Sequence, residues 1–195
     1  LIVTARGGTV RTGTTSGSWT SRATSKGTTN TYDFDKYNFD GTDKIIIATG
    51  EAAAFTLNTS YSEDIINATG GGTAPTNPKF VKSFANHMFY GGMSNAKSTL
   101  TFSGPYTEDD FDTNAGSIIM GDVITGLKVF RNELFVFCET SIFKITGTSS
   151  SNFAKAEVAK GIGTLAHHSI QEIGGDIIFL AADGIRTIAG TARIG

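Results

Sequence analysis

The chain has 195 residues, enough for one domain with a substantial core or for part of a larger array. Its 16 Lys and Arg and 18 Asp and Glu give a formal charge of −2, and the basic residues are scattered singly. This pattern argues against a nucleic-acid binder, which usually carries a basic stripe, and against an anionic membrane partner.

Cys138 is the single cysteine, so the chain can form no internal disulfide and no cysteine-based metal site. It sits in the apolar run 134–138, where we expect a buried strand thiol. No apolar run approaches the length of a membrane span, and no signal peptide is seen. Because the chain opens at Leu1 directly in a strand-like run, we expect a piece of a longer polypeptide.

One unit recurs along the chain: a short apolar strand, a turn, and a second short strand. The five copies start near residues 1, 45, 88, 134 and 177, at spacings of 44, 43, 46 and 43. The paired runs are 1–5 with 8–12, 45–48 with 54–57, 88–91 with 99–102, 134–137 with 142–145, and 177–180 with 185–188. Five copies at so even a period indicate a repeat protein.

Other segments complete each unit. Further apolar stretches precede three of the copies, at 80–84, 124–130 and 169–173, and a weaker fourth strand is seen at 153–159 and at 19–23. Residues 6–31 are rich in Thr, Ser and Gly and predict loops between short strands. The Gly-rich run 70–78 predicts a flexible connection, and residues 61–68 predict one short helical turn.

We therefore predict an all-β fold: a β-propeller-like array of four-stranded blades with a repeat of about 44 residues. Residues 1–195 would form a single region of about four to five blades. The near-continuous apolar central strands fit sheets that are covered on both faces. A β-solenoid or a pair of sandwiches is the alternative, although solenoid coils are typically shorter than this repeat.

The polar residues nominate no catalytic, cofactor-binding or metal-ligating residue, so we expect a protein that is not an enzyme and has no cofactor. The acidic run 108–112 lacks the spacing of a helix-loop-helix calcium site and predicts a solvated loop between blades. His167 and His168 are neighbours on an expected strand and would point to opposite faces, and His87 falls in a turn. There is no G-x-S-x-G elbow, phosphate loop or dinucleotide loop.

Several runs within residues 79–190 belong to one pattern: 86–92, 102–106, 109–111, 121–127, Ile124–Cys138 followed by Ser141 and Ile142, and 174–180 with 183–185. Together they resemble bacteriophage virion proteins of the tail nozzle and tail-accessory type. The resemblance covers a little over half of the chain, and its motifs are mostly strand-forming residues. They inform the fold more than a site.

The resemblance implies a virion structural protein of the tail, assembled in the bacterial cytoplasm. Such a protein would form a homo-oligomeric ring with other tail proteins, through which genomic DNA leaves without sequence-specific binding and without membrane insertion. A channel of this kind should be neutral or acidic, because basic walls would retain phosphates. The alternatives are a host-receptor or glycan-binding module of a baseplate or fibre and, with less support, a glycan-degrading propeller enzyme.

Overall fold

The computed structural model describes residues 2–29 and 31–191, and it is all-β with five small antiparallel sheets. Leu1, the predicted start of the first repeat, lies outside the described residues. We number the sheets 1 to 5 in chain order. Sheet 1 holds β1 (Ile2–Arg6), β2 (Thr9–Gly13) and β3 (Trp19–Ala23), and sheet 2 holds β4 (Asp33–Tyr37), β5 (Lys44–Ala48), β6 (Phe55–Leu57) and β7 (Glu63–Ile65).

Sheets 3 and 4 also have four strands each, and sheet 5 has three. Sheet 3 holds β8 (Phe80–Phe84), β9 (His87–Gly91), β10 (Thr99–Phe102) and β11 (Gly116–Ile119). Sheet 4 holds β12 (Ile124–Phe130), β13 (Glu133–Cys138), β14 (Ser141–Thr146) and β15 (Ala154–Lys160). Sheet 5 holds β16 (Gln171–Ile173), β17 (Asp176–Ala181) and β18 (Gly184–Thr187), flanked by the short helices η1 (His167–Ser169) and α1 (Ile188–Thr191).

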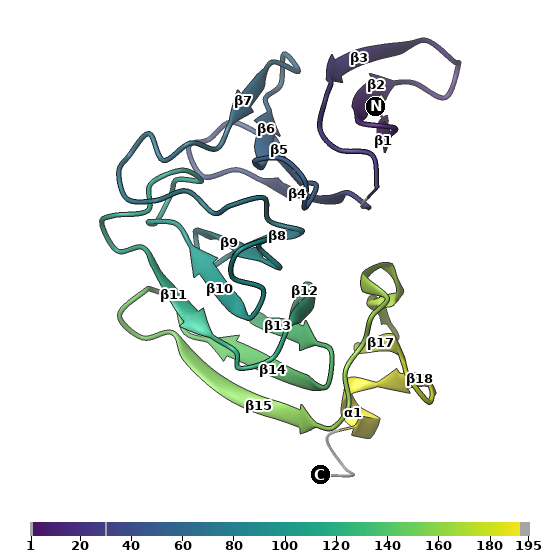
Figure 1. The fold of residues 1–195 in the computed structure, drawn as a ribbon, viewed down its shortest axis with the longest axis vertical. Helices are drawn as coiled ribbons and strands as arrows, with labels where there is room; N and C mark the ends of the chain where they lie inside the picture. The colour runs from purple at the N-terminus through teal and green to yellow at the C-terminus, as the bar shows by residue number, and fades with distance from the viewer. Residues whose placement is uncertain (1, 30, 192–195) are drawn as a thin grey trace.

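Each sheet is a simple meander in which consecutive strands pair antiparallel. The strands β1, β5, β9, β13 and β17 fall at the predicted repeat positions, and the next strand along the chain forms the predicted hairpin in every copy. The repeat read from the sequence is therefore confirmed as a structural unit. Figure 1 shows the sheets following one another around an arc, with sheets 1 and 5 on either side of its opening.

Two-residue turns join the first two strands of sheets 3, 4 and 5. Both turn residues have positive φ in each case: 49° and 61° at Ala85 and Asn86, 49° and 60° at Arg131 and Asn132, and 61° and 81° at Gly174 and Gly175. Positive φ at both positions is the pattern of the type I′ turn, whose twist matches that of paired strands. The polar turns before the central strands therefore fix the register of these hairpins.

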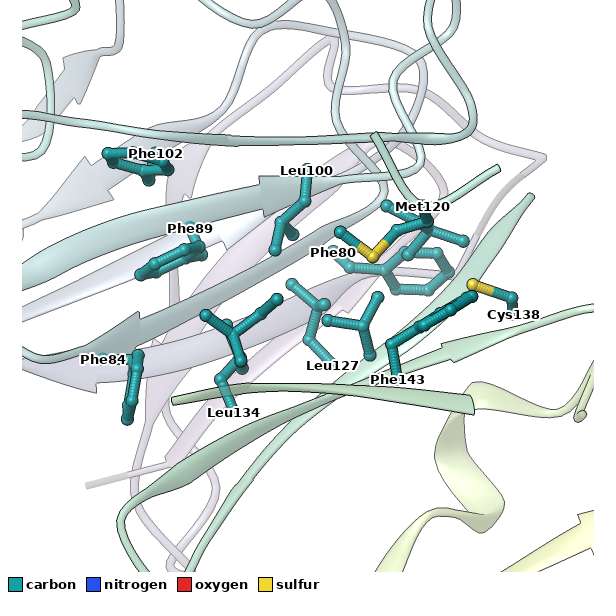
Figure 2. Close-up of a cluster of buried hydrophobic side chains, with 13 residues drawn as sticks. Phe80, Phe84, Phe89, Leu100, Phe102, Met120, Leu127, Leu134, Cys138 and Phe143 are labelled. Carbon is teal, nitrogen blue, oxygen red and sulfur yellow. The ribbon is translucent and has the colours of Figure 1, made fainter. Parts of the chain in front are cut away.

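Neighbouring sheets share an apolar cluster, and the inner strands contribute to two clusters at once. On β13, Leu134, Val136 and Cys138 join the cluster between sheets 3 and 4. The alternate residues Phe135 and Phe137 join the cluster between sheets 4 and 5. Figure 2 shows side chains of sheets 3 and 4 meeting in the first of these clusters. Because successive residues of a strand point to opposite faces, an apolar run with no polar alternation is what such a strand requires.

Several expectations for the connecting segments need correction. No helical turn forms at 61–68, because β7 pairs there with β6, and Tyr61 and Ala68 adopt positive φ of 60° and 62°. The weaker fourth strands predicted near 19–23 and 153–159 are confirmed as β3 and β15. β4, β7 and β11 were not predicted from the sequence, since these strands are short or carry polar residues.

Two apolar residues at the same register position in sheets 4 and 5 test whether stacking of the sheets stabilises the fold. Phe137 is fully buried by sheet 5, whereas Leu180, at the same register in sheet 5, is 46% exposed. We expect Phe137→Ala to lower the free energy of unfolding by about 3–5 kcal/mol. Leu180→Ala, the control, should lower it by less than about 1 kcal/mol, measured by urea unfolding. Equal losses in the two variants would contradict two-sided burial of the inner strands.

Candidate functional site at the centre of the arc

The connection from sheet 4 to sheet 5, residues 161–170, reaches the inside of the arc and carries the histidine pair. Its ends are anchored to both sheets: the Thr164 N–H donates to the Cys138 carbonyl (3.0 Å), and the Thr164 hydroxyl donates to the Leu180 carbonyl (2.6 Å). The Leu180 N–H in turn donates to the Ser169 hydroxyl at 3.0 Å. The hydroxyls of Thr164 and Ser169 thus satisfy the backbone carbonyl and N–H of Leu180, in the part of β17 that does not pair with β16.

His167 crosses from this connection to sheet 2. Its Nε2–H donates to Oδ1 of Asp33 over 3.0 Å, and its ring packs on Phe80 with centroids 4.7 Å apart. A side chain at Gly126 would prevent this approach, because a Cβ there would lie 2.9 Å from His167 Nδ1 and 2.4 Å from Ile170 Cδ1. Glycine at position 126 therefore lets the connection lie directly on β12.

The Asp33 carboxylate accepts several hydrogen bonds. Besides His167, its oxygens accept the N–H groups of Phe34 and Val81, each at 3.0 Å, and the residue is only 7% exposed. Since Val81 belongs to β8, which does not pair with β4 in any sheet, this carboxylate supplies a link that strand pairing does not. Asp33 therefore ties sheet 2 both to sheet 3 and to the connection before sheet 5.

Asp35, two residues further along β4, repeats this arrangement. Its Oδ2 accepts both the N–H and the hydroxyl of Ser83 at 2.7 Å, and its Oδ1 pairs with Nζ of Lys82 at 2.7 Å. Residues i and i+2 of a strand share a face, so both carboxylates of β4 point at β8. The alternating Asp-Phe-Asp of β4 is the sequence signal that could have indicated this pair.

A cavity of about 450 Å³ adjoins this region. Its lining includes Lys79, Thr125, Glu139 and both residues of the histidine pair. Thr125 Oγ1 and His167 Nδ1 are buried and have no hydrogen-bond partner among the described residues. A Cβ at Gly126 would lie 2.9 Å from Nδ1, so this ring nitrogen lies close to the backbone of β12.

The structure corrects the sequence-based view of the three histidines. His167 and His168 lie in η1 rather than on a strand, with ring centroids 5.1 Å apart. His87 is the first residue of β9, is 1% exposed, and its Nδ1 lies 2.6 Å from the Ser103 carbonyl oxygen. Within residues 2–29 and 31–191, no group of three or more His, Cys, Asp or Glu side chains could hold a metal ion.

The acidic run 108–112 was expected to be a solvated loop between blades, but it lies within sheet 3, between β10 and β11, and its first residue is not solvated. Glu108 pairs with Lys44 at 2.9 Å, and its side chain is only 12% exposed. The loop joins β10 to β11 and packs on the Gly-rich connection, where a Cβ at Gly72 would lie 2.1 Å from the Phe111 carbonyl oxygen. The glycines at 70–72 therefore permit close packing of two segments.

Two other polar groups have clear structural environments. Cys138 is fully buried, as predicted, and burial together with the nearby Asp122 raises the pKa of its thiol to about 12, so it stays protonated and unreactive. Burial alone would raise the pKa of Asp122. Hydrogen bonds from Ser141 and Thr140 outweigh it and hold that pKa below its usual range.

Replacing the Asp33 carboxylate tests the structural role of this region. We expect Asp33→Asn to lower the free energy of unfolding by about 2–3 kcal/mol, because the amide NH2 group replaces one of the two oxygens that accept from Val81 and His167. Asp64→Asn is the matched control on the exposed strand β7 and should change stability by less than about 0.5 kcal/mol. Thermal or urea unfolding measures both, and a neutral Asp33→Asn would refute the assignment.

Comparison with known proteins supports the fold. Two crystal structures of BBS1N, a β-propeller, in complex with ARL6DN resemble the chain: the one soaked with mercury has a TM-score of 0.58 at 11% identity, and the one soaked with lead has 0.50 at 12%. The matches cover 93% and 92% of this chain, which spans 58% and 59% of the matched chains. No protein-family model and no curated protein matches. Likeness at such identity concerns the fold alone: an all-β array of β-propeller type.

Proposed function

We propose that this chain is a structural, non-enzymatic component of a bacteriophage tail, in which the five sheets are blades of a β-propeller wall. Sheets 2, 3 and 4 would be complete four-stranded blades, and sheets 1 and 5 would contribute three strands each. Its partners would be other tail proteins and further copies of itself, assembled in the bacterial cytoplasm.

The observation that carries the proposal is the position of the phage-like run in the fold. The run Ile124–Cys138 forms β12 and β13, and its side chains enter the apolar clusters on both sides of sheet 4. The residues that carry the resemblance therefore lie in the apolar core of sheet 4, as a wall-forming role would require. The buried carboxylates of Asp33 and Asp35 likewise hold neighbouring strands together, which suits a rigid part of a particle.

Passage of DNA, in this proposal, runs between subunits rather than through a single arc. The His167–Asp33 hydrogen bond spans the inside of the arc, and the ring of His167 packs on Phe80 there. A duplex needs a free bore wider than its own diameter, and this connection occupies space inside the arc. We expect the wall that faces DNA to be neutral or acidic, because Lys and Arg would retain phosphates.

Location in the virus particle tests the proposal. Particles of the phage that encodes this sequence would be purified and labelled with gold-conjugated antibodies raised against the chain. We expect label at the tail in electron micrographs, and peptides of the chain in mass spectra of the same particles. An antibody against the major capsid protein serves as the control for particle integrity and labelling.

Two outcomes would count against a tail wall. Detection of the chain in infected cells but never in purified particles would contradict a virion role. Label confined to fibre tips, together with binding of the chain to host-cell envelopes, would instead support the host-surface binding module.

A further inference from the structure

β15 is the outer strand of sheet 4, and among residues 2–29 and 31–191 it pairs only with β14. Its 7 residues make it longer than the last strands of the other sheets, which have 5, 3, 4 and 4 residues in β3, β7, β11 and β18. Figure 1 shows β15 on the outside of the arc. The N–H and C=O groups along its free edge can therefore bind a further strand.

The two faces of β15 differ in chemistry. Lys155 and Glu157 lie opposite residues of β14 that belong to the cluster between sheets 3 and 4, so both charged side chains point to that side. Ala154 and Ala156 point to the other side, and Val158 packs on the cluster between sheets 4 and 5. One face thus carries a positive and a negative charge two residues apart, and the other carries small apolar residues.

Lys155 and Glu157 are exposed, and neither forms a salt bridge with any residue that the structure describes. The Lys155 ammonium donates to the Ile119 carbonyl oxygen over 2.8 Å and lies 5.0 Å from the centroid of the Phe143 ring. This ammonium and the Glu157 carboxylate are therefore both open to an opposite charge on a partner strand.

A second β15 brings opposite charges to this edge in one antiparallel register. Two copies of one edge pair around a two-fold axis perpendicular to the sheet, which keeps the charged faces of both copies on the same side. Paired residues then differ by an even number of positions, so the axis passes beside a residue. At Lys155 or Glu157 the axis would bring like charges together. At Ala156 it places Lys155 of each copy opposite Glu157 of the other, and on the second face it places Ala154 opposite Val158.

We propose that β15 pairs with β15 of a second copy of this chain in the antiparallel register centred on Ala156. Lysine on a strand edge ordinarily discourages association, because identical edges bring like charges together. Here the spacing of Lys155 and Glu157 converts that repulsion into two ion pairs across the strands. A contact of an edge with itself closes at two copies, and it does not depend on the proposed tail function.

The paired stretch is short, and this sets the expected strength. A register shift between Ile142 and Phe143 leaves Val158 as a bulge, which ends the regular part of β15. One pair of short strands buries less than the roughly 800 Å² on each partner of a standard interface. We therefore expect a dissociation constant of about 10–100 μM. Sedimentation velocity of the chain from about 1 to about 300 μM should show a reversible shift from monomer to dimer.

Charge reversal tests the pairing of the two side chains. Lys155→Glu and Glu157→Lys each put two pairs of like charges across the axis, so each variant alone should have a dissociation constant raised by about tenfold or more. An equimolar mixture of the two variants restores both opposite-charge pairs and should dimerise about as strongly as the unchanged chain. Thermal unfolding verifies that both variants remain folded, as their exposed positions predict.

A cysteine at the axis tests the register directly. Ala156→Cys places two thiols at directly paired positions, whose Cα atoms lie about 4.5–5.5 Å apart and within reach of a disulfide. Ala154→Cys is the matched control on the same face, because its two copies would lie four positions apart along the strands, about 13 Å. The native Cys138 is buried. We expect mild oxidation to link the first variant into dimers on gels without reductant and to leave the second monomeric.

Several results would overturn the proposal. A chain that stays monomeric at about 300 μM would show that the edge does not pair with itself. A dimer that neither charge reversal weakens, or a mixture of the two variants that fails to associate, would place the contact elsewhere. Equal crosslinking of Ala156→Cys and Ala154→Cys would contradict the register.

Discussion

Burial of both faces of the central strands is the constraint on which this structure depends. A small sheet of three or four short strands cannot bury enough apolar surface alone, so each one must be stacked between neighbours. β13 meets the requirement with an uninterrupted apolar run whose alternate residues enter the clusters on either side. Among residues 2–29 and 31–191, sheet 5 is stacked on one side only, and Leu180 and Ile185 on its other side are exposed.

Stacking fixes the spacing between sheets but leaves their innermost strands without shared backbone hydrogen bonds. Carboxylates fill that role where β4 meets β8, and the His167–Asp33 contact extends the link to a residue 134 positions away in the chain. A buried carboxylate with several donors is well satisfied, whereas one that loses a donor is costly. The carboxylates of Asp33 and Asp35 and the imidazole of His167 thus link neighbouring sheets through hydrogen bonds.

The fold was more predictable from the sequence than the centre of the arc. Apolar runs such as 134–138 repeat at an even period, and local patterning of this kind reports strand position directly. β4 was not predicted because its Asp-Phe-Asp alternation has few apolar residues. The helical turn predicted at 61–68 was wrong because β7, which lies in this segment, pairs with β6. The contact of His167 with Asp33 depends on how distant sheets curve around the arc, and no local pattern in a single sequence encodes that.

If stacking makes the array one cooperative body, its inner strands should open together. Native-state hydrogen exchange followed by mass spectrometry measures this most directly, because it reports the opening free energy of each segment. We predict that peptides covering β5, β9 and β13 exchange slowly, with the same dependence on added denaturant, through a single global opening. Exchange of each sheet with its own free energy and its own denaturant dependence would contradict the account.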